Sequence, residues 1–294
     1  MTLQDPAWLD SVYNNRELVP DHAAFLARWA TDSERVRSVE PCTLDVPYGG
    51  GPRETLNIFP ATGDAKAKAG APVLVFIHGG YWRSLDKGGH SFIAPPFTAE
   101  GVCVVMPNYP LCPGTPERPV GIPDIALSMV RALEWTWRHV AEYGGDPSRI
   151  TVAGHSAGGH LAAMMLSCEW AAVAPDLPLD LVRNALSISG VHDLRPLQHT
   201  PFLMDSLRLT ESDARRASPA LFAAPKARTL YAVAGGDESE AFAWQARSIH
   251  DAWGRATVPV CDILPGLHHF SVLDALVDPE HALHGYALRL LLTE

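Results

Sequence analysis

Ser156 stands in a local pattern that can build a catalytic nucleophile. It is flanked by Gly154 and Gly158 as G-x-S-x-G, after the apolar run Ile150–Ala153 and before an apolar helical stretch. A sharp turn between strand and helix lifts a serine hydroxyl above the sheet, and the two glycines leave room for neighbouring backbone. The next N–H, from Ala157, would then lie at a helix N-terminus that favours a developing oxyanion. The five-residue pattern also occurs by chance, so the strand and helix around it carry the interpretation.

A serine hydroxyl at its ordinary pKa is a weak nucleophile and needs a base, which is itself oriented by an acid. Two loops after apolar runs supply candidates further along the chain. Asp237 follows one run, with Glu238 beside it as the nearest alternative acid, and the pair His268 and His269 follows the next. Asp237 could also be a solvated loop acid or a helix cap. One of the two histidines is expected to be the base.

A pair of glycines follows another apolar run, Val73–Ile77, within the segment His78-Gly79-Gly80-Tyr81-Trp82. Glycines at such a position let the backbone approach a reacting centre and aim its N–H groups there, as an oxyanion hole requires. The aromatic residues after them have two readings. Tyr81 and Trp82 could pack in the core, or they could line an acyl or aryl pocket.

The elements that must position these residues follow from hydrophobic patterning, since short β-branched runs alternate with amphipathic helical stretches. This alternation predicts an α/β fold, with a mostly parallel doubly wound sheet and an antiparallel N-terminal edge, in which function gathers at the carboxyl ends of strands. The predicted strands are Cys42–Tyr48 and Glu54–Phe59, which form the antiparallel edge, then Val73–Ile77, Val102–Met106, Ile150–Ala153, Ala185–Ser189, Thr229–Val233 and Val258–Leu264. The predicted helices are Ile122–Val140, Ala157–Leu166, Ala241–Trp253 and Ala282–Leu292, and residues 60–72 are predicted to form a loop.

Composition excludes several other classes of protein. The 294 residues carry 23 basic and 33 acidic side chains, a net charge of −10, and no Lys/Arg cluster of the kind that binds nucleic acid or anionic membranes. The five cysteines are scattered without a CxxC pair, and no HExxH motif occurs, so neither a metal nor another cofactor is expected. No signal-peptide pattern and no apolar run of about 18 residues occurs, which predicts a cytoplasmic protein.

Taken together, these loops resemble the α/β-hydrolase superfamily. His78-Gly79-Gly80-Tyr81-Trp82 is similar to the HGGxW motif of its kynurenine formamidase (arylformamidase) branch, which is related to the hormone-sensitive-lipase-like esterases. Gly236-Asp237-Glu238-Ser239 and His269-Phe270 are similar to the acid and base loops of that branch. The resemblance implies these roles: Ser156 as nucleophile, Asp237 as orienting acid, His269 as base, Gly79, Gly80 and Ala157 as oxyanion donors, and Tyr81 and Trp82 in the substrate pocket.

The implied reaction is hydrolysis of an N-formyl aryl amide such as N-formylkynurenine, by a Ser-His-Asp triad and through a formyl-enzyme intermediate. Arg83, beside the oxyanion loop, could meet a substrate carboxylate or could be a surface ion-pair partner. The alternative is a carboxylesterase that acts on small acyl or aryl esters with the same apparatus. A binding protein of this fold without turnover is disfavoured, because it would normally have lost one of the catalytic residues.

The motifs spread over residues 78–269, so a domain boundary between them would divide one catalytic site. We therefore expect residues 1–294 to form a single domain, with 1–40 and 193–225 as cap segments over the active site. The expected partner is a small-molecule substrate, and neither a nucleic acid nor a membrane is expected as a partner. The protein could form a homodimer.

Overall fold

The computed structural model describes residues 5–62 and 70–293. Their strands form one sheet in the order β1-β2-β4-β3-β5-β6-β7-β8. The pairs β1·β2 and β2·β4 are antiparallel and the remaining pairs are parallel, which confirms the predicted fold class. The strands are β1 (Thr43–Pro47), β2 (Thr55–Phe59), β3 (Ala71–Ile77), β4 (Cys103–Pro107), β5 (Gly145–His155), β6 (Asn184–Ile188), β7 (Thr229–Gly235) and β8 (Val260–Leu264). The predicted loop 60–72 lies partly outside the described residues, and its end, from Ala71, belongs to β3.

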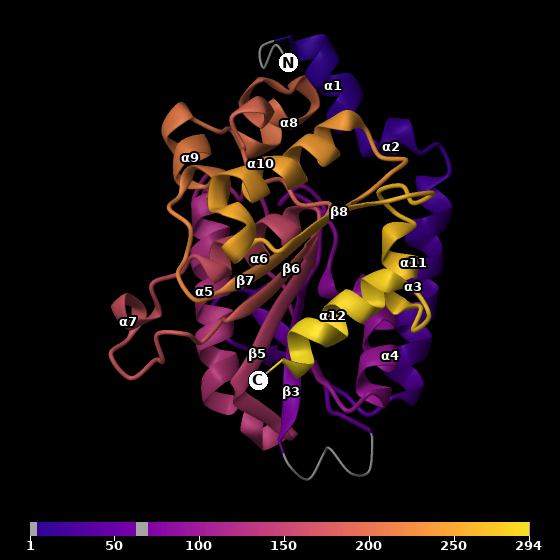
Figure 1. Cartoon of the computed structure of the whole chain (residues 1–294), viewed down its shortest axis with the longest axis vertical. Coiled ribbons are helices and arrows are strands. Elements are labelled where there is room, and N and C mark those ends of the chain that lie inside the picture. The colour runs from indigo at the N-terminus through magenta and orange to yellow at the C-terminus, as the bar shows by residue number, and fades with distance from the viewer. Residues whose placement is uncertain (1–4, 63–69, 294) are drawn as a thin grey trace.

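Helices cover both faces of this sheet (Figure 1). The four predicted helices are present as α5, α6, α10 and α12. The helices are α1 (Pro6–Tyr13), α2 (Asn15–Leu18), α3 (His22–Val39), α4 (Ala94–Ala99), α5 (Ile122–His139), α6 (Ala157–Leu166), α7 (Trp170–Val173), α8 (Pro201–Leu207), α9 (Glu211–Arg216), α10 (Glu240–Thr257), α11 (Val272–Val277) and α12 (Ala282–Leu292).

Side chains of β3 alternate between the two faces, as a strand buried on both sides requires. Val73, Val75 and Ile77 belong to a core shared with α5, α6 and α10. Leu74 and Phe76 belong to a second core shared with α3, α4, α11 and α12. Because both faces are covered, the carboxyl ends of the strands are the part of the sheet left to build a site.

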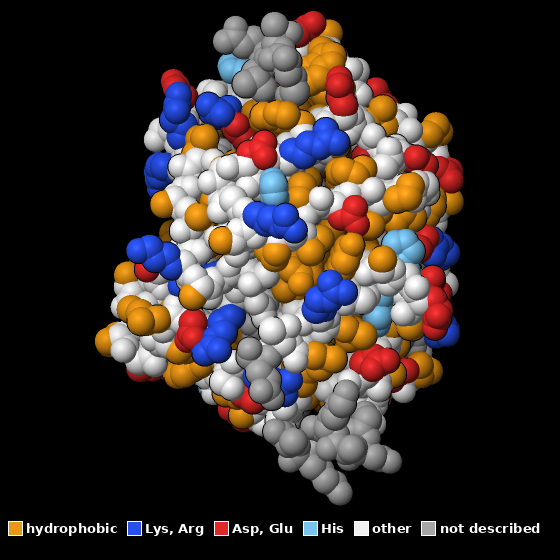
Figure 2. Space-filling model, in the orientation of Figure 1, with side chains coloured by type: hydrophobic (Ala, Val, Ile, Leu, Met, Phe, Trp, Pro, Cys, Tyr) orange, Lys and Arg blue, Asp and Glu red, His pale blue; other side chains and the backbone are white. Residues whose placement is uncertain are grey.

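The surface carries charges of both signs. Figure 2 shows Lys and Arg interspersed with Asp and Glu on the face that it presents, rather than gathered into one basic patch. None of the helices in the ranges 5–62 and 70–293 is long and apolar enough to cross a membrane.

His160 and His192 are among the buried histidines that have only one ring nitrogen hydrogen-bonded. His160 Nε2 lies 2.7 Å from the carbonyl of Ala217, and His192 Nε2 lies 3.2 Å from Ser187 Oγ, whereas the Nδ1 atoms of both rings have no partner among the described residues. Burial is the main cause that lowers the pKa of His160 to about 4 and that of His192 to about 3. Both rings are therefore held neutral, because protonation would bury a charge and an unpaired N–H.

This burial predicts that the fold loses stability in mild acid. In the unfolded chain each histidine has its ordinary pKa of 6.5. Below that pH the two side chains are protonated in the unfolded chain but stay neutral in the folded protein. The free energy of unfolding should then fall between about pH 7.5 and 5.5, by about 1 kcal/mol for each of the two residues. Urea titrations at the two pH values measure the change. A free energy of unfolding that stays constant or rises on acidification would contradict the neutral, buried state.

Candidate active site

Ser156 lies at the junction of β5 and α6, where the sequence predicts a sharp turn. Its backbone has a positive φ, with φ +56° and ψ −118°, an unusual conformation for a residue other than glycine. The turn requires glycine on both sides: a Cβ on Gly154 would lie 2.2 Å from the carbonyl oxygen of Gly158, and one on Gly158 would lie 1.9 Å from that of Ile77. The amide of Ser156 donates to the carbonyl of Ile188, 2.8 Å away. The serine is therefore held at the carboxyl end of the sheet by its backbone.

His269 follows β8 and contacts a buried carboxylate. Its Nδ1–H donates to Glu238 Oε2 at 2.6 Å, and the exposed fractions of the two side chains are 6% and 0%. Glu238, and not Asp237, is thus the acid that meets this histidine, which corrects the assignment expected from the sequence. Asp237 is exposed, and its amide donates to the carbonyl of Leu267. Adjacent side chains in the turn after β7 leave the backbone in different directions. Glu238 therefore lies in the interior beside His269, whereas Asp237 lies at the surface.

The Glu238 carboxylate is fixed from more than one side. Its Oε1 accepts from the amide of Gly235 at 2.7 Å and from the hydroxyl of Ser189, which follows β6. These two donors hold the carboxylate in the position where its other oxygen meets His269. Ser189 was missed by the sequence interpretation, which placed it within a predicted strand. Its backbone has φ +51°, and nothing in the local sequence predicts a positive φ at this position.

His268, the other candidate base, has a structural environment. Its Nδ1 accepts from the amides of Phe270 and Ser271, at 3.1 and 3.2 Å, and its ring packs edge-on against Phe25 with centroids 5.0 Å apart. The Nδ1 atom of His268 therefore stabilises the turn at Phe270 and Ser271, and the ring packs against α3. His269, and not His268, lines the cavity that Ser156 also lines.

His155, the residue before Ser156, connects the turn of Ser156 with the loop of His269. Its ring N–H donates through Nε2 to the backbone carbonyl of His269 at 2.8 Å. Burial, and then the neighbouring His269, lower the pKa of His155 well below its ordinary value, so the ring is neutral. The turn that carries Ser156 and the loop that carries His269 are thus linked directly.

The loop after β3 brings Gly79 and Gly80 beside the serine. A Cβ on Gly79 would lie 3.1 Å from Ser156 Cβ, and one on Gly80, whose φ is +107°, would lie 2.2 Å from the carbonyl oxygen of Ser84. The Tyr109 hydroxyl donates to the carbonyls of His78 and Gly79, at 2.9 and 3.1 Å. In a trans peptide the N–H points away from the preceding carbonyl. The N–H groups of Gly79 and Gly80 therefore point away from Tyr109.

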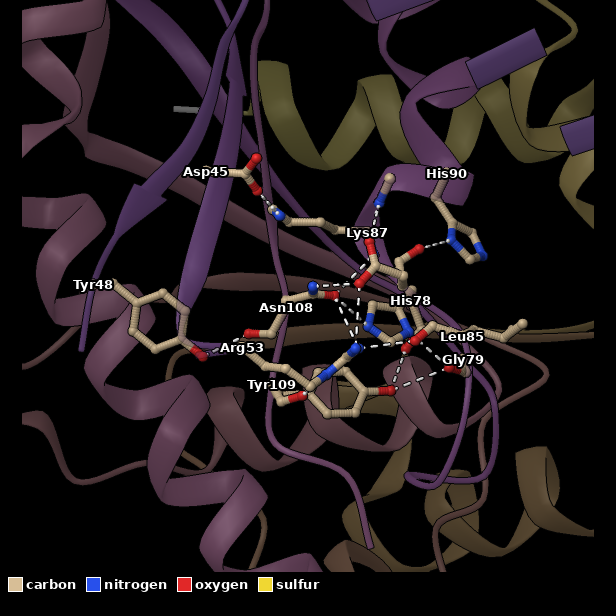
Figure 3. Close-up of polar contacts among 12 residues, drawn as sticks. Asp45, Tyr48, Arg53, His78, Gly79, Leu85, Lys87, His90, Asn108 and Tyr109 are labelled. Carbon is tan, nitrogen blue, oxygen red and sulfur yellow. Dashed lines mark hydrogen bonds and ion pairs between the residues drawn. The ribbon is translucent and has the colours of Figure 1, made fainter. Parts of the chain in front are cut away.

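A polar network behind this loop holds it to the end of β4 (Figure 3). Asn108 is its centre: Oδ1 accepts from the amide of Lys87 at 2.8 Å and faces His78 Nε2 at 3.1 Å, while Nδ2 donates to Asp86 Oδ2 at 2.6 Å. Arg53 donates to the carbonyls of Tyr109 and Leu85 and pairs with Asp86 at 3.3 Å. The network is therefore part of the scaffold of the site.

Ser156, His269, Gly80 and Tyr81 line one cavity of about 210 Å³. The hydroxyl of Tyr81 donates to the carbonyl of Tyr13 at 2.5 Å, which leaves its ring to form the wall. Trp82, also predicted to contact substrate, does not line the cavity. It is fully buried and packs edge-on against His160, with ring centroids 4.9 Å apart. Both residues have positive φ, and this irregular backbone sends the two side chains to different places.

The cavity is walled in part by both segments that were expected to act as a cap. Phe202, in α8, comes from the 193–225 segment and packs edge-on against Tyr81 at 5.6 Å. Residues 1–40 contribute Asn14, Asn15, Arg16, Leu26 and Trp29. From the sequence, the whole segment was placed in the cap, and Asn14, Asn15 and Arg16 were not assigned to the pocket.

No group of three or more His, Cys, Asp or Glu residues in the described part of the chain is arranged to hold a metal ion. The site brings together a serine, a histidine paired with a buried carboxylate, and nearby backbone N–H groups. This set can perform acyl transfer to a serine hydroxyl.

Comparison with known proteins places this arrangement in a family. A family model described as the carboxylesterase family matches residues 55–200. The kynurenine formamidase of Danio rerio is 30% identical over 277 residues, which cover 91% of this chain and 88% of that protein. The chain belongs to the kynurenine formamidase-like branch of the α/β-hydrolase superfamily. Its homologues are hydrolases, and this protein is therefore an enzyme that catalyses hydrolysis.

Esterases are also similar to this α/β-hydrolase. Esterase LipQ of Mycobacterium tuberculosis is 32% identical over 254 residues, which cover 80% of this chain and 58% of that protein. A crystal structure from Silicibacter sp. TM1040, provisionally described as a thioesterase, superposes with a TM-score of 0.79 at 31% identity and covers 97% of this chain and 99% of its own. The family therefore includes both amide and ester hydrolases, and the choice between them depends on the pocket.

Proposed function

We propose that the protein hydrolyses an N-formyl aryl amide such as N-formylkynurenine through a formyl-enzyme intermediate on Ser156. The observation that carries the proposal is that His269, which lines the same cavity as Ser156, is paired with the buried carboxylate of Glu238. In this proposal the triad is Ser156, His269 and Glu238. Similarity to the Danio rerio kynurenine formamidase over 91% of the chain supports the substrate class.

The reaction would run in two halves. His269 uses Nδ1 to meet Glu238, so Nε2 is the ring nitrogen left to take the proton of Ser156 as its oxygen attacks the formyl carbon. The imidazolium then gives this proton to the amide nitrogen, and the aryl amine leaves. Water, deprotonated by the same ring, attacks the formyl ester, and formate and the free serine are released.

The oxyanion formed in each half would be stabilised by backbone donors. The N–H of Ala157 is the first of helix α6 and has no intrahelical acceptor. The N–H groups of Gly79 and Gly80 point away from Tyr109, and Gly79 lies against the serine. Fixed donors in a water-poor site stabilise a developing charge without reorganisation. We assign the oxyanion hole to these three residues.

The cavity suits a small acyl group on an aromatic leaving group. Its walls include Tyr81, Phe202, Trp29 and Phe270, which offer flat apolar contact to an aryl ring. We propose that the segments 1–40 and 193–225, which supply Trp29 and Phe202, act as the cap of a single catalytic domain. A formyl group is small, so most of the binding free energy must come from this leaving-group side.

The second candidate is a carboxylesterase that acts on small acyl or aryl esters. It is favoured by the carboxylesterase family model and by the similarity to esterase LipQ. Ester and amide cleavage share the tetrahedral intermediate, so the same residues would serve both.

A paired assay on the purified protein separates the two candidates. We expect kcat/KM for N-formylkynurenine to exceed that for p-nitrophenyl acetate, because only the first substrate fills the leaving-group side of the cavity. Release of arylamine and release of nitrophenol are followed spectrophotometrically under the same conditions. A preference for the ester by a wide margin would support the carboxylesterase instead.

A further inference from the structure

Two positively charged side chains line the catalytic cavity. Arg16 and Arg83 both line it, and no Asp or Glu is among the described residues that do so. Neither arginine forms an ion pair with a carboxylate in the part of the chain that the structure describes. Burial, and then the charge of Arg16, lower the pKa of the Arg83 guanidinium from its ordinary value, so the two cations are close enough to repel.

The two arginines differ in how they are held. Arg83 is half-buried: its Nη1 donates to the carbonyl of Phe202 at 2.7 Å and to Ser206 Oγ at 2.9 Å, and its guanidinium lies 5.4 Å from the centre of the Phe202 ring. Arg16 is exposed at the cavity and has no hydrogen-bond partner among the described residues. A fixed cation beside an adjustable one is a suitable arrangement for an anion that enters from solvent.

Unused hydrogen-bond donors accompany these charges. Asn15 and Trp29 line the same cavity and are 4% and 2% exposed. Asn15 Nδ2 and Trp29 Nε1 are buried and have no partner among the described residues. A buried donor without a partner is costly. The cavity thus combines two unpartnered buried donors with two cations, and no carboxylate of the described residues lines it. This combination indicates that the acceptor atoms of a bound ligand complete the hydrogen bonds.

We propose that this wall, formed by Asn15, Arg16, Trp29 and Arg83, binds a carboxylate on the leaving-group side of the substrate. The inference deepens the proposed function and rests on it: the preferred substrates are aryl amides or esters with a carboxylate remote from the bond that is cleaved. N-formylkynurenine carries such a group. A neutral substrate of the same shape would leave the arginines uncompensated and is disfavoured.

The test uses two substrates that differ by one charge. They are the deaminated analogue of N-formylkynurenine, which keeps the carboxylate, and its primary carboxamide. We expect the wild type to prefer the carboxylate by about tenfold or more in kcat/KM, mainly through KM, because the contact is the same in the ground state and the transition state. Arg16→Gln should lower this preference about tenfold, the effect of one charge-assisted contact.

Arg35→Gln is the matched control. Arg35 is an exposed arginine of the same N-terminal region, paired with Asp32 at 3.5 Å and outside the cavity, so its replacement should leave the preference unchanged. Equal rates for the two substrates in the wild type, or an equal loss for both in Arg16→Gln, would overturn the inference.

Failure of the proposed function gives a different result. In that case neither formamide is turned over while p-nitrophenyl acetate is hydrolysed. The same pair is then used as inhibitors of ester hydrolysis. Stronger competitive inhibition by the carboxylate, weakened about tenfold by Arg16→Gln, supports the anion-binding wall, and equal inhibition by both compounds refutes it.

Discussion

Replacing Ser156 by alanine is expected to lower kcat about 10³-fold or more while the protein stays folded. The hydroxyl oxygen is the atom that would attack the substrate, and no other side chain can take its place in the turn. The fold should tolerate the change because the serine is held through its backbone: the amide bonds to the carbonyl of Ile188, and Gly154 and Gly158 provide the space for the turn. Alanine keeps the Cβ and removes only the oxygen.

The measurement is steady-state turnover of N-formylkynurenine and of p-nitrophenyl acetate, with circular dichroism and thermal unfolding to establish that the variant is native. Ser148→Ala is a matched control, since Ser148 is exposed in the same strand and its hydroxyl donates to the neighbouring Asp146. Turnover within a few-fold of wild type by a folded Ser156→Ala protein would remove the serine from the mechanism, for both candidate functions.

The second large effect is expected at Glu238 and not at its neighbour. Glu238→Gln should lower kcat about 10³-fold, because an amide cannot stabilise the imidazolium and its NH₂ group competes for the position that the His269 Nδ1–H requires. The residue loses its charge and keeps its shape. The remaining carbonyl oxygen can still accept from the amide of Gly235, so the turn after β7 should survive.

Asp237→Asn is the natural comparison, because it is the same chemical change one residue away. Asp237 is exposed and contacts neither His269 nor the cavity, so kcat should change less than about threefold. Both variants are assayed with one substrate and checked by thermal unfolding. A damaging Asp237→Asn together with a tolerated Glu238→Gln would reverse the assignment of the acid.

The Asp237–Glu238 pair illustrates a limit of reading a sequence. The loop after β7 could be recognised as an acid loop, because it follows a buried strand and precedes a helix. The sequence does not show which of its two adjacent carboxylates, Asp237 or Glu238, faces the histidine. What separates them is the direction in which each leaves the backbone, together with partners from distant loops: His269 after β8 and Ser189 after β6.

The pocket shows the same limit. Tyr81 and Trp82 are adjacent aromatics in one motif, yet only Tyr81 lines the cavity, and Trp82 is enclosed beside α6. Asn15 and Arg16 were not assigned to the pocket from the sequence, and they reach the site because α1 and α2 pack near the carboxyl ends of the strands. Contacts between segments far apart in sequence depend on the whole fold.

The sequence by itself determined the alternation of strands and helices, the turn around Ser156 and the glycine pair of the loop after β3. These features depend on forces that act within a few residues: hydrophobic periodicity, and the steric need for glycine where backbones nearly touch. Only the tertiary structure decided that Glu238 orients toward His269, that Trp82 belongs to the core, and that Arg16 faces the cavity. Each of these outcomes is set by packing between segments that meet only when the sheet is complete.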